Sequence, residues 1–290
     1  MTATTPNTPT YFQQQQPTMS PAINSPSYTP SQSSPTPTTA PIVRKHTFPV
    51  PLLRLELRDL AHEGSSIFLT NINGSEDLST QVQNVLNLLY FSPKDTPASH
   101  RPGTRSVTFI IRAYDGVAYT TGLDLDSDHK EINISAKYIK TCARDGDKRH
   151  ELLGVICHEL VHCFQWDAEG TCPGGLIEGI ADWVRLRAGL GAAHWKQEAS
   201  GEWDGGYQKT GYFLEWLERK FGEGTVRRLN GCLRKGEYDG EKVFGECCGG
   251  EKVEELWKAY RKDLEKGNKG GEGGEGGPAN PIPTHPAKKE

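Results

Sequence analysis

The sequence has no charged residue before Arg44. Pro, Thr, Ser and Gln dominate this stretch, a composition that buries too little apolar surface to offset the entropy lost when a chain becomes ordered. The other end is biased as well, since seven of the eleven residues from Gly267 to Gly277 are Gly. We therefore expect disordered tails over 1–45 and 267–290, and one folded domain over 46–266.

Three further absences exclude whole classes of protein. No run approaches the roughly 18 apolar residues that cross a bilayer, and the N-terminus has neither a basic nor an apolar signal region. The net charge of -4 gives no general basic excess for binding nucleic acid. We expect a monomer that has no membrane or nucleic-acid partner and is cytoplasmic or non-classically secreted.

The cysteines show no paired pattern. There are seven of them at irregular spacing, with no CxxC pair. An odd number at such spacing does not indicate a disulfide framework or a zinc ribbon, so we expect reduced thiols.

The order of periodic segments predicts the fold class. Residues 52–58 and 106–111 have strand patterns, and an amphipathic helix is expected over 77–91. Short strands around 118–121 and 131–134 should flank a polar, Asp-rich turn. Strands followed by helices favour an α+β domain with a small mixed sheet and a mostly helical C-terminal half. The later helices are expected at 148–166, 175–189, 208–221, 224–233 and 250–264.

The most informative motif is His158-Glu-Leu-Val-His162. Two histidines four residues apart on a helix project from the same face and can bind one metal ion. Glu159 follows the first histidine but points about 100° away around the helix, so its carboxylate can reach a metal-bound water without binding the metal. Apolar flanking residues indicate that this helix is buried, where a polar pair needs a partner.

A second segment offers the remaining ligand. A hydrolytic zinc site needs three protein ligands and an open position. Glu178 and Asp182 lie four residues apart within an apolar helix. We predict Glu178 as the third ligand and Asp182 as the carboxylate that accepts the free ring N–H of a liganding histidine. The alternative is that both belong to an exposed acidic face.

These segments together carry a family resemblance. The HExxH motif, followed by the run from Gly174 to Arg185, resembles the basic secretory protein family of plants and fungi over about residues 50–265. The resemblance implies a zincin-like, zinc-dependent peptidase of the gluzincin type, in which the downstream Glu is a metal ligand. It also implies that a Tyr or His on a later helix stabilises the oxyanion, and Tyr207 resembles that residue; it could equally be an ordinary half-buried aromatic.

The sequence therefore predicts a zinc metallopeptidase acting on a peptide or protein substrate. His158, His162 and Glu178 would bind Zn²⁺, while Glu159 and Tyr207 would be catalytic. Two alternatives remain at this point: a non-catalytic zinc-binding or protein-interaction module that keeps the fold, and a structural zinc site closed by Cys172.

Overall fold

The computed structural model of the chain describes residues 46–94, 96, 100–142 and 146–269. No helix among them is long and apolar enough to cross a membrane. Nearly all of the two expected tails lies outside the described residues; only 267–269 are described, and they continue the last helix. The domain boundaries stay predictions.

The sheet is small and mixed. Its strand order is β1-β2-β4-β3, with β2 parallel to both β1 and β4 and with β3 antiparallel to β4. β2 is a β-branched and aromatic run that is buried almost throughout, as expected for a central strand. β3 pairs on one side only and forms an edge of this sheet. The strands are β1 (Leu52–Leu57), β2 (Ser106–Arg112), β3 (Ala118–Leu123) and β4 (Asp126–Ser135).

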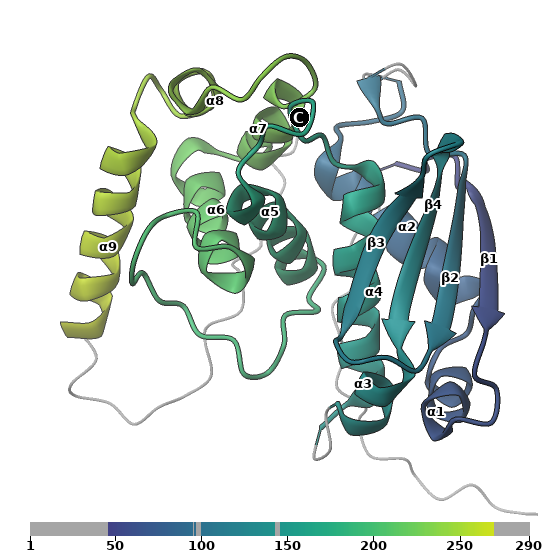
Figure 1. Cartoon of the computed structure of the whole chain (residues 1–290). Helices are drawn as coiled ribbons and strands as arrows, with labels where there is room; N and C mark the ends of the chain where they lie inside the picture. Colours follow the sequence, from purple (N-terminus) through teal and green to yellow (C-terminus); the bar gives the residue numbers. More distant parts are fainter. Residues whose placement is uncertain (1–45, 95, 97–99, 143–145, 270–290) are drawn as a thin grey trace, which may run out of the picture. The chain divides into compact units, whose positions relative to one another are not determined.

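Helices cover one face of the sheet and make up the C-terminal half. Figure 1 shows α2 and α4 behind the strands, and α4 contacts α2, α5 and the edge strand β3. The predicted α+β architecture is confirmed. The helices are α1 (Glu63–Asn71), α2 (Glu76–Leu89), α3 (Ala136–Thr141), α4 (Lys148–Phe164), α5 (Gly174–Arg187), α6 (Tyr207–Phe221), α7 (Thr225–Cys232), α8 (Gly240–Cys247) and α9 (Val253–Lys269).

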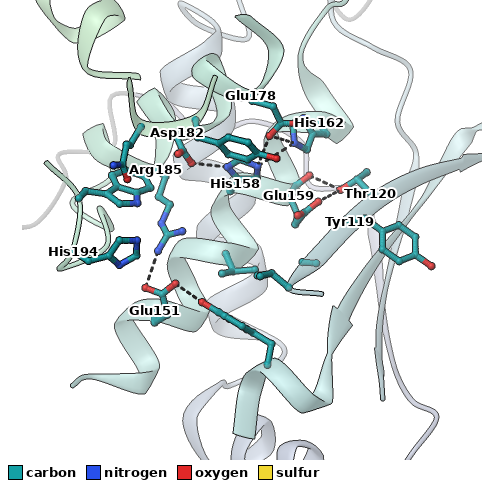
Figure 2. Close-up of a pocket in the computed structure, with 17 residues that line it drawn as sticks. Tyr119, Thr120, Glu151, His158, Glu159, His162, Glu178, Asp182, Arg185 and His194 are labelled. Atoms are coloured by element: carbon teal, nitrogen blue, oxygen red, sulfur yellow. Dashed lines mark hydrogen bonds and ion pairs between the residues drawn. The ribbon is translucent and has the colours of Figure 1, made fainter. Parts of the chain in front are cut away.

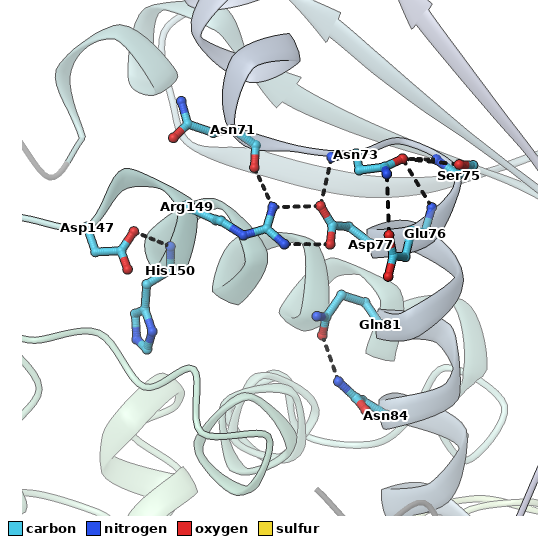
Figure 3. A network of polar contacts seen from close by, with 10 residues as sticks. All are labelled: Asn71, Asn73, Ser75, Glu76, Asp77, Gln81, Asn84, Asp147, Arg149 and His150. Atoms are coloured by element: carbon cyan, nitrogen blue, oxygen red, sulfur yellow. Dashed lines mark hydrogen bonds and ion pairs between the residues drawn. The ribbon is translucent and has the colours of Figure 1, made fainter. Parts of the chain in front are cut away.

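A polar network fixes the start of α4 against the start of α2. The Arg149 guanidinium donates to both Asp77 carboxylate oxygens, at 2.7 Å each, and to the Asn71 carbonyl (Figure 3). Asp77 also accepts the Asn73 backbone N–H at 2.7 Å. Two parallel N–H···O bonds give this contact a defined geometry, so the network orients α4 relative to the helix beside it.

Close packing brings α6 onto α5. A Cβ atom added at Gly179 would lie 2.3 Å from Cγ2 of Thr210, and one added at Gly211 would lie 3.2 Å from the Trp183 backbone nitrogen. A side chain at Gly179 would therefore push the two helices apart. This packing sets the distance between the α5 side chains and the first turn of α6.

Two details differ from the sequence expectation. The short helices α1, α3 and α8 are not predicted by the sequence pattern. The Asp-rich turn placed between the two short strands is wrong in extent, since β4 already begins at Asp126 and pairs with β3 from there. The reason is that a tight hairpin connection needs only the two residues 124–125.

Candidate active site

The two motif histidines share one face of α4. Asp147 caps this helix by accepting the His150 backbone N–H at 3.0 Å. The opposite side of α4 is held in the core by fully buried residues such as Ile156 and Leu160. His158 and His162 lie on the other side with 12% and 18% of their side chains exposed, so they reach a cavity and not open solvent.

Glu178 of α5 completes a group of three donor atoms (Figure 2). His158 Nε2 lies 3.1 Å from Glu178 Oε2 and 3.3 Å from His162 Nε2. The His162 Nε2 to Glu178 Oε2 distance is 3.8 Å. Two ligands of a tetrahedral zinc ion with bonds of about 2.0 to 2.2 Å are about 3.3 to 3.6 Å apart. The three atoms are therefore spaced closely enough to hold one metal ion.

Asp182, one helical turn beyond Glu178, contacts the other ring nitrogen of His158. Its Oδ1 is 2.7 Å from His158 Nδ1. Because a carboxylate accepts hydrogen bonds, Nδ1 carries the proton, and Nε2 is directed toward Glu178 and His162. This is the arrangement in which a second carboxylate fixes the tautomer of a liganding histidine.

Gln165, which the sequence analysis did not assign a role, occupies the corresponding position beside His162. Its amide nitrogen lies 2.8 Å from His162 Nδ1, while its buried Oε1 has no partner. If His162 Nε2 binds a metal, Nδ1 must carry a proton and needs an acceptor. The oxygen and nitrogen of an amide exchange places when the amide group is rotated. In the rotated orientation the unpartnered oxygen of Gln165 accepts a hydrogen bond from the His162 Nδ1–H. The donor set therefore fits a metal at this site.

The charges of the site also fit a cation. Burial lowers the pKa of His158, but its hydrogen bonds to Asp182 and Glu178 outweigh burial and raise this pKa to about 9. Burial and the charge of His158 lower the pKa of His162 to about 4. The pKa of Glu178 is lowered because the two histidines outweigh its burial. A cation among the three donors would take the place of the proton that His158 otherwise holds.

Glu159 lies beside the metal group without joining it. The residue is 6% exposed, and burial raises the pKa of its carboxyl group. Thr120 of the edge strand β3 donates its hydroxyl to Glu159 Oε2 at 2.7 Å. No sequence pattern pointed to Thr120, which is 39 residues away along the chain. The contact holds the carboxylate in one orientation at the cavity wall.

Tyr207 begins α6 at the mouth of the same cavity. Its ring lies nearly parallel to the His158 ring, with centroids 6.3 Å apart. Its backbone has φ 48°, a left-handed conformation that is costly for a bulky residue, and it follows Gly206 at φ 80°. Such strain is found most often at functional sites. The residue is 60% exposed, so its hydroxyl is not fixed by core packing.

The cavity has a volume of about 850 Å³ and is lined by β3, α4, α5 and the start of α6. Besides the residues above, its wall includes Tyr138, Glu151, Val155, Arg185 and Trp195. Cys172, considered as a fourth ligand, neither lines this cavity nor belongs to the metal group, and its thiol donates to the Pro173 carbonyl. All seven cysteines are free.

The fold and site thus describe an α+β protein with a His-His-Glu group that could hold a metal. A comparison with protein families matches residues 50–260 to the family described as BSP, peptidase of plants and bacteria. The chain belongs to this family, which confirms the resemblance and supports a peptidase-like function. Searches of curated proteins and of solved structures found no match.

Proposed function

We propose that this protein is a zinc-dependent metallopeptidase that hydrolyses a peptide or protein substrate. The observation that carries the proposal is the position of Glu159 next to three donors at metal-binding distances. A carboxylate that is buried, bonded to Thr120 and not needed as a ligand is costly for a site that only holds a metal. The same carboxylate is useful to a site that activates water.

Each of the protein's groups would have a separate task. His158, His162 and Glu178 would hold the ion, with Asp182 and Gln165 orienting the two rings. A zinc ion held there would supply Lewis acidity, which polarises a carbonyl and lowers the pKa of water to about 7.

Proton transfer falls to Glu159. Its carboxylate accepts the proton of the attacking water and passes it to the nitrogen of the leaving amine. The raised pKa of the carboxyl group suits this second step, because the acid must be able to hold the proton. The Tyr207 hydroxyl would donate a hydrogen bond to the oxyanion of the tetrahedral intermediate, and loss of such a donor costs about 2.7 to 4 kcal/mol in comparable sites.

The substrate backbone would lie along β3. This strand pairs with β4 on one side only. Residues 118–120 of the strand and residue 117 just before it line the cavity. An extended peptide could bind to its free edge as an added strand. Thr120, whose hydroxyl donates to Glu159, would then lie beside the substrate backbone.

The test combines metal content with turnover on one preparation. Purified full-length protein is analysed for bound metal, then incubated with an unbiased peptide library with and without a chelator. The proposal predicts one zinc per chain, cleavage that the chelator stops and recovery when zinc is added back. Stoichiometric zinc without cleavage would instead favour the non-catalytic binding module.

A further inference from the structure

The cavity extends beyond the metal group to a second end with different chemistry. Glu151 lies seven residues before His158 on α4, about 10 Å along the helix axis. Arg185 lies seven residues after Glu178 on α5. Both line the cavity, and Figure 2 shows them below the metal group with the guanidinium directed at the carboxylate. This end is too far from the donors to bind the same ion.

The two buried charges at this end, those of Glu151 and Arg185, already have partners. Arg185 Nη2 donates to Glu151 Oε2 at 2.9 Å, and the Tyr138 hydroxyl donates to Glu151 Oε1 at 2.7 Å. Arg185 Nε donates to the Leu190 carbonyl at 2.8 Å. The two charged side chains are only 8% and 14% exposed. A charged substrate group placed on this ion pair would lose its water without finding an uncompensated opposite charge on Glu151 or Arg185.

The surrounding surface suits a large uncharged side chain. Val155, 4% exposed, lies between Glu151 and His158 on the same face of α4 and lines the cavity. Trp195 stacks on the Arg185 guanidinium, with 4.8 Å from Cζ to the ring centroid. Tyr138 provides a second aromatic wall. Aromatic side chains gain from ring contacts of this kind beyond the area they bury.

We propose that the Glu151–Arg185 end of the cavity is a side-chain subsite that selects a large, uncharged aromatic residue of the peptide next to the scissile bond. This inference rests on the proposed peptidase function. The ion pair forms the floor of the subsite, and Val155, Tyr138 and Trp195 form its walls. A peptide backbone along β3 would direct one side chain away from the strand and toward this end.

The rival explanation is that the ion pair only clamps α4 to α5. The Arg185 side chain does pack closely against α4, since a Cβ added at Gly154 would lie 2.5 Å from Arg185 Nε. A clamp, however, needs no open space beside it. Here the ion pair faces the same cavity as the metal group, so it is accessible to whatever binds there.

The test compares peptides that differ at one position beside the scissile bond, scanned on both sides with Phe, Ala, Lys and Glu. Full-length wild-type protein is compared with Val155→Phe, which fills the subsite, and with Val161→Ala, a core change on α4 away from the cavity. The subsite predicts that kcat/KM for Phe exceeds that for Ala by about tenfold or more at one position. Val155→Phe should abolish this ratio, and Val161→Ala should keep it.

The outcomes separate the subsite from the chemistry. Cleavage without aromatic preference, a preference for Lys or Glu, or a preference that Val155→Phe leaves intact overturns the subsite while the peptidase proposal stands. If no peptide is cleaved, the peptidase proposal fails, and affinities for the same peptides decide the subsite alone. Tighter binding of the Phe peptide that is lost in Val155→Phe supports it, and equal binding of all four peptides overturns it.

Discussion

The seam between α4 and α5 has two polar ends that differ in charge balance. At one end a single carboxylate, Glu151, meets a single guanidinium, Arg185. At the other end three carboxylates face two imidazoles, and Arg185 is the one Lys or Arg among the described residues that line the cavity. In a balanced buried pair, each charge is neutralised by its partner. An excess of carboxylates over permanent positive charges favours an added cation, so this is the end that could hold a metal.

The largest effect is expected from removing a donor at the unbalanced end. Glu178→Ala should lose its metal during dialysis against a mild chelator and lose hydrolysis with it, because two histidines alone hold zinc weakly. Asp182→Asn should keep most of the metal and lose about 10- to 100-fold in activity or affinity, since it acts through His158. Metal analysis and turnover of both variants check this. An emptied Asp182→Asn beside a loaded Glu178→Ala would reverse the ligand assignment.

At the balanced end the expected loss is one of stability. Glu151→Gln or Arg185→Met alone leaves a buried charge without its partner, and breaking such a pair costs about 3 to 5 kcal/mol. The double variant should recover part of this loss, because neither charge is then left alone. Denaturant unfolding of the four proteins gives the coupling energy. Additive losses would show that the two residues do not act as a pair.

Sequence and structure agree best where the chemistry is local. His158, Glu159 and His162 lie on one helix, whereas Glu178 and Asp182 are rivals by sequence alone, and spacing together with the family resemblance favours Glu178 as the third donor. Thr120 could not be predicted, because its contact with Glu159 depends on how the edge strand aligns with α4. Gln165 lies three residues after His162. Its contact with the His162 ring is nevertheless recognised only from the structure, where the Gln165 Oε1 atom is buried without a partner.

The difference between local sequence signals and contacts between distant segments also explains why three helices were not predicted. α1, α3 and α8 have only 9, 6 and 8 residues, too few for stability in isolation, so they depend on tertiary packing. α1 depends on a tertiary contact, since a Cβ added at Gly64 would lie 2.0 Å from the Ala136 carbonyl oxygen at the start of α3. Long amphipathic segments such as α2 and α4 were predicted to within two residues at each end.

A smaller effect is expected from the contact that orients Glu159. Thr120→Val removes the hydroxyl but keeps the shape of the side chain, so the carboxylate is free to turn. We expect kcat to fall about 10- to 100-fold with zinc content unchanged, because a displaced base is a poor proton acceptor. Thr120→Ser should restore most of kcat. Thr121→Val on the same strand, whose hydroxyl bonds only to Gly122, is the matched control. A rise in KM without a fall in kcat would argue against this orienting role.

The smallest effect concerns the network that orients α4 from outside the cavity. The hydrogen bond from Arg149 outweighs burial and lowers the pKa of Asp77. Its contribution is therefore present above the unfolded-state pKa of about 3.9 and is lost as pH falls through the lower folded-state value. Because Arg149 is half exposed, Asp77→Asn should cost only about 1 to 2 kcal/mol at pH 7.

The pH dependence of that cost is the check. Unfolding free energies of wild type and Asp77→Asn should converge as the solution becomes more acidic than about pH 4. Glu76→Gln, on the neighbouring exposed residue, should show little difference at any pH. A difference between wild type and Asp77→Asn that stays constant with pH would mean that the carboxylate charge is not what stabilises the contact.

The role of Glu159 as the base is tested most directly with the Glu159→Gln variant, with zinc content and peptide hydrolysis measured on the same sample. The amide keeps the size of the side chain and its bond to Thr120, but it cannot accept the proton of water. Glu159→Gln should bind zinc at the wild-type stoichiometry and lose about 10²- to 10⁴-fold in kcat, the range of a general base. Hydrolysis close to the wild-type rate in the zinc-loaded variant would contradict this role.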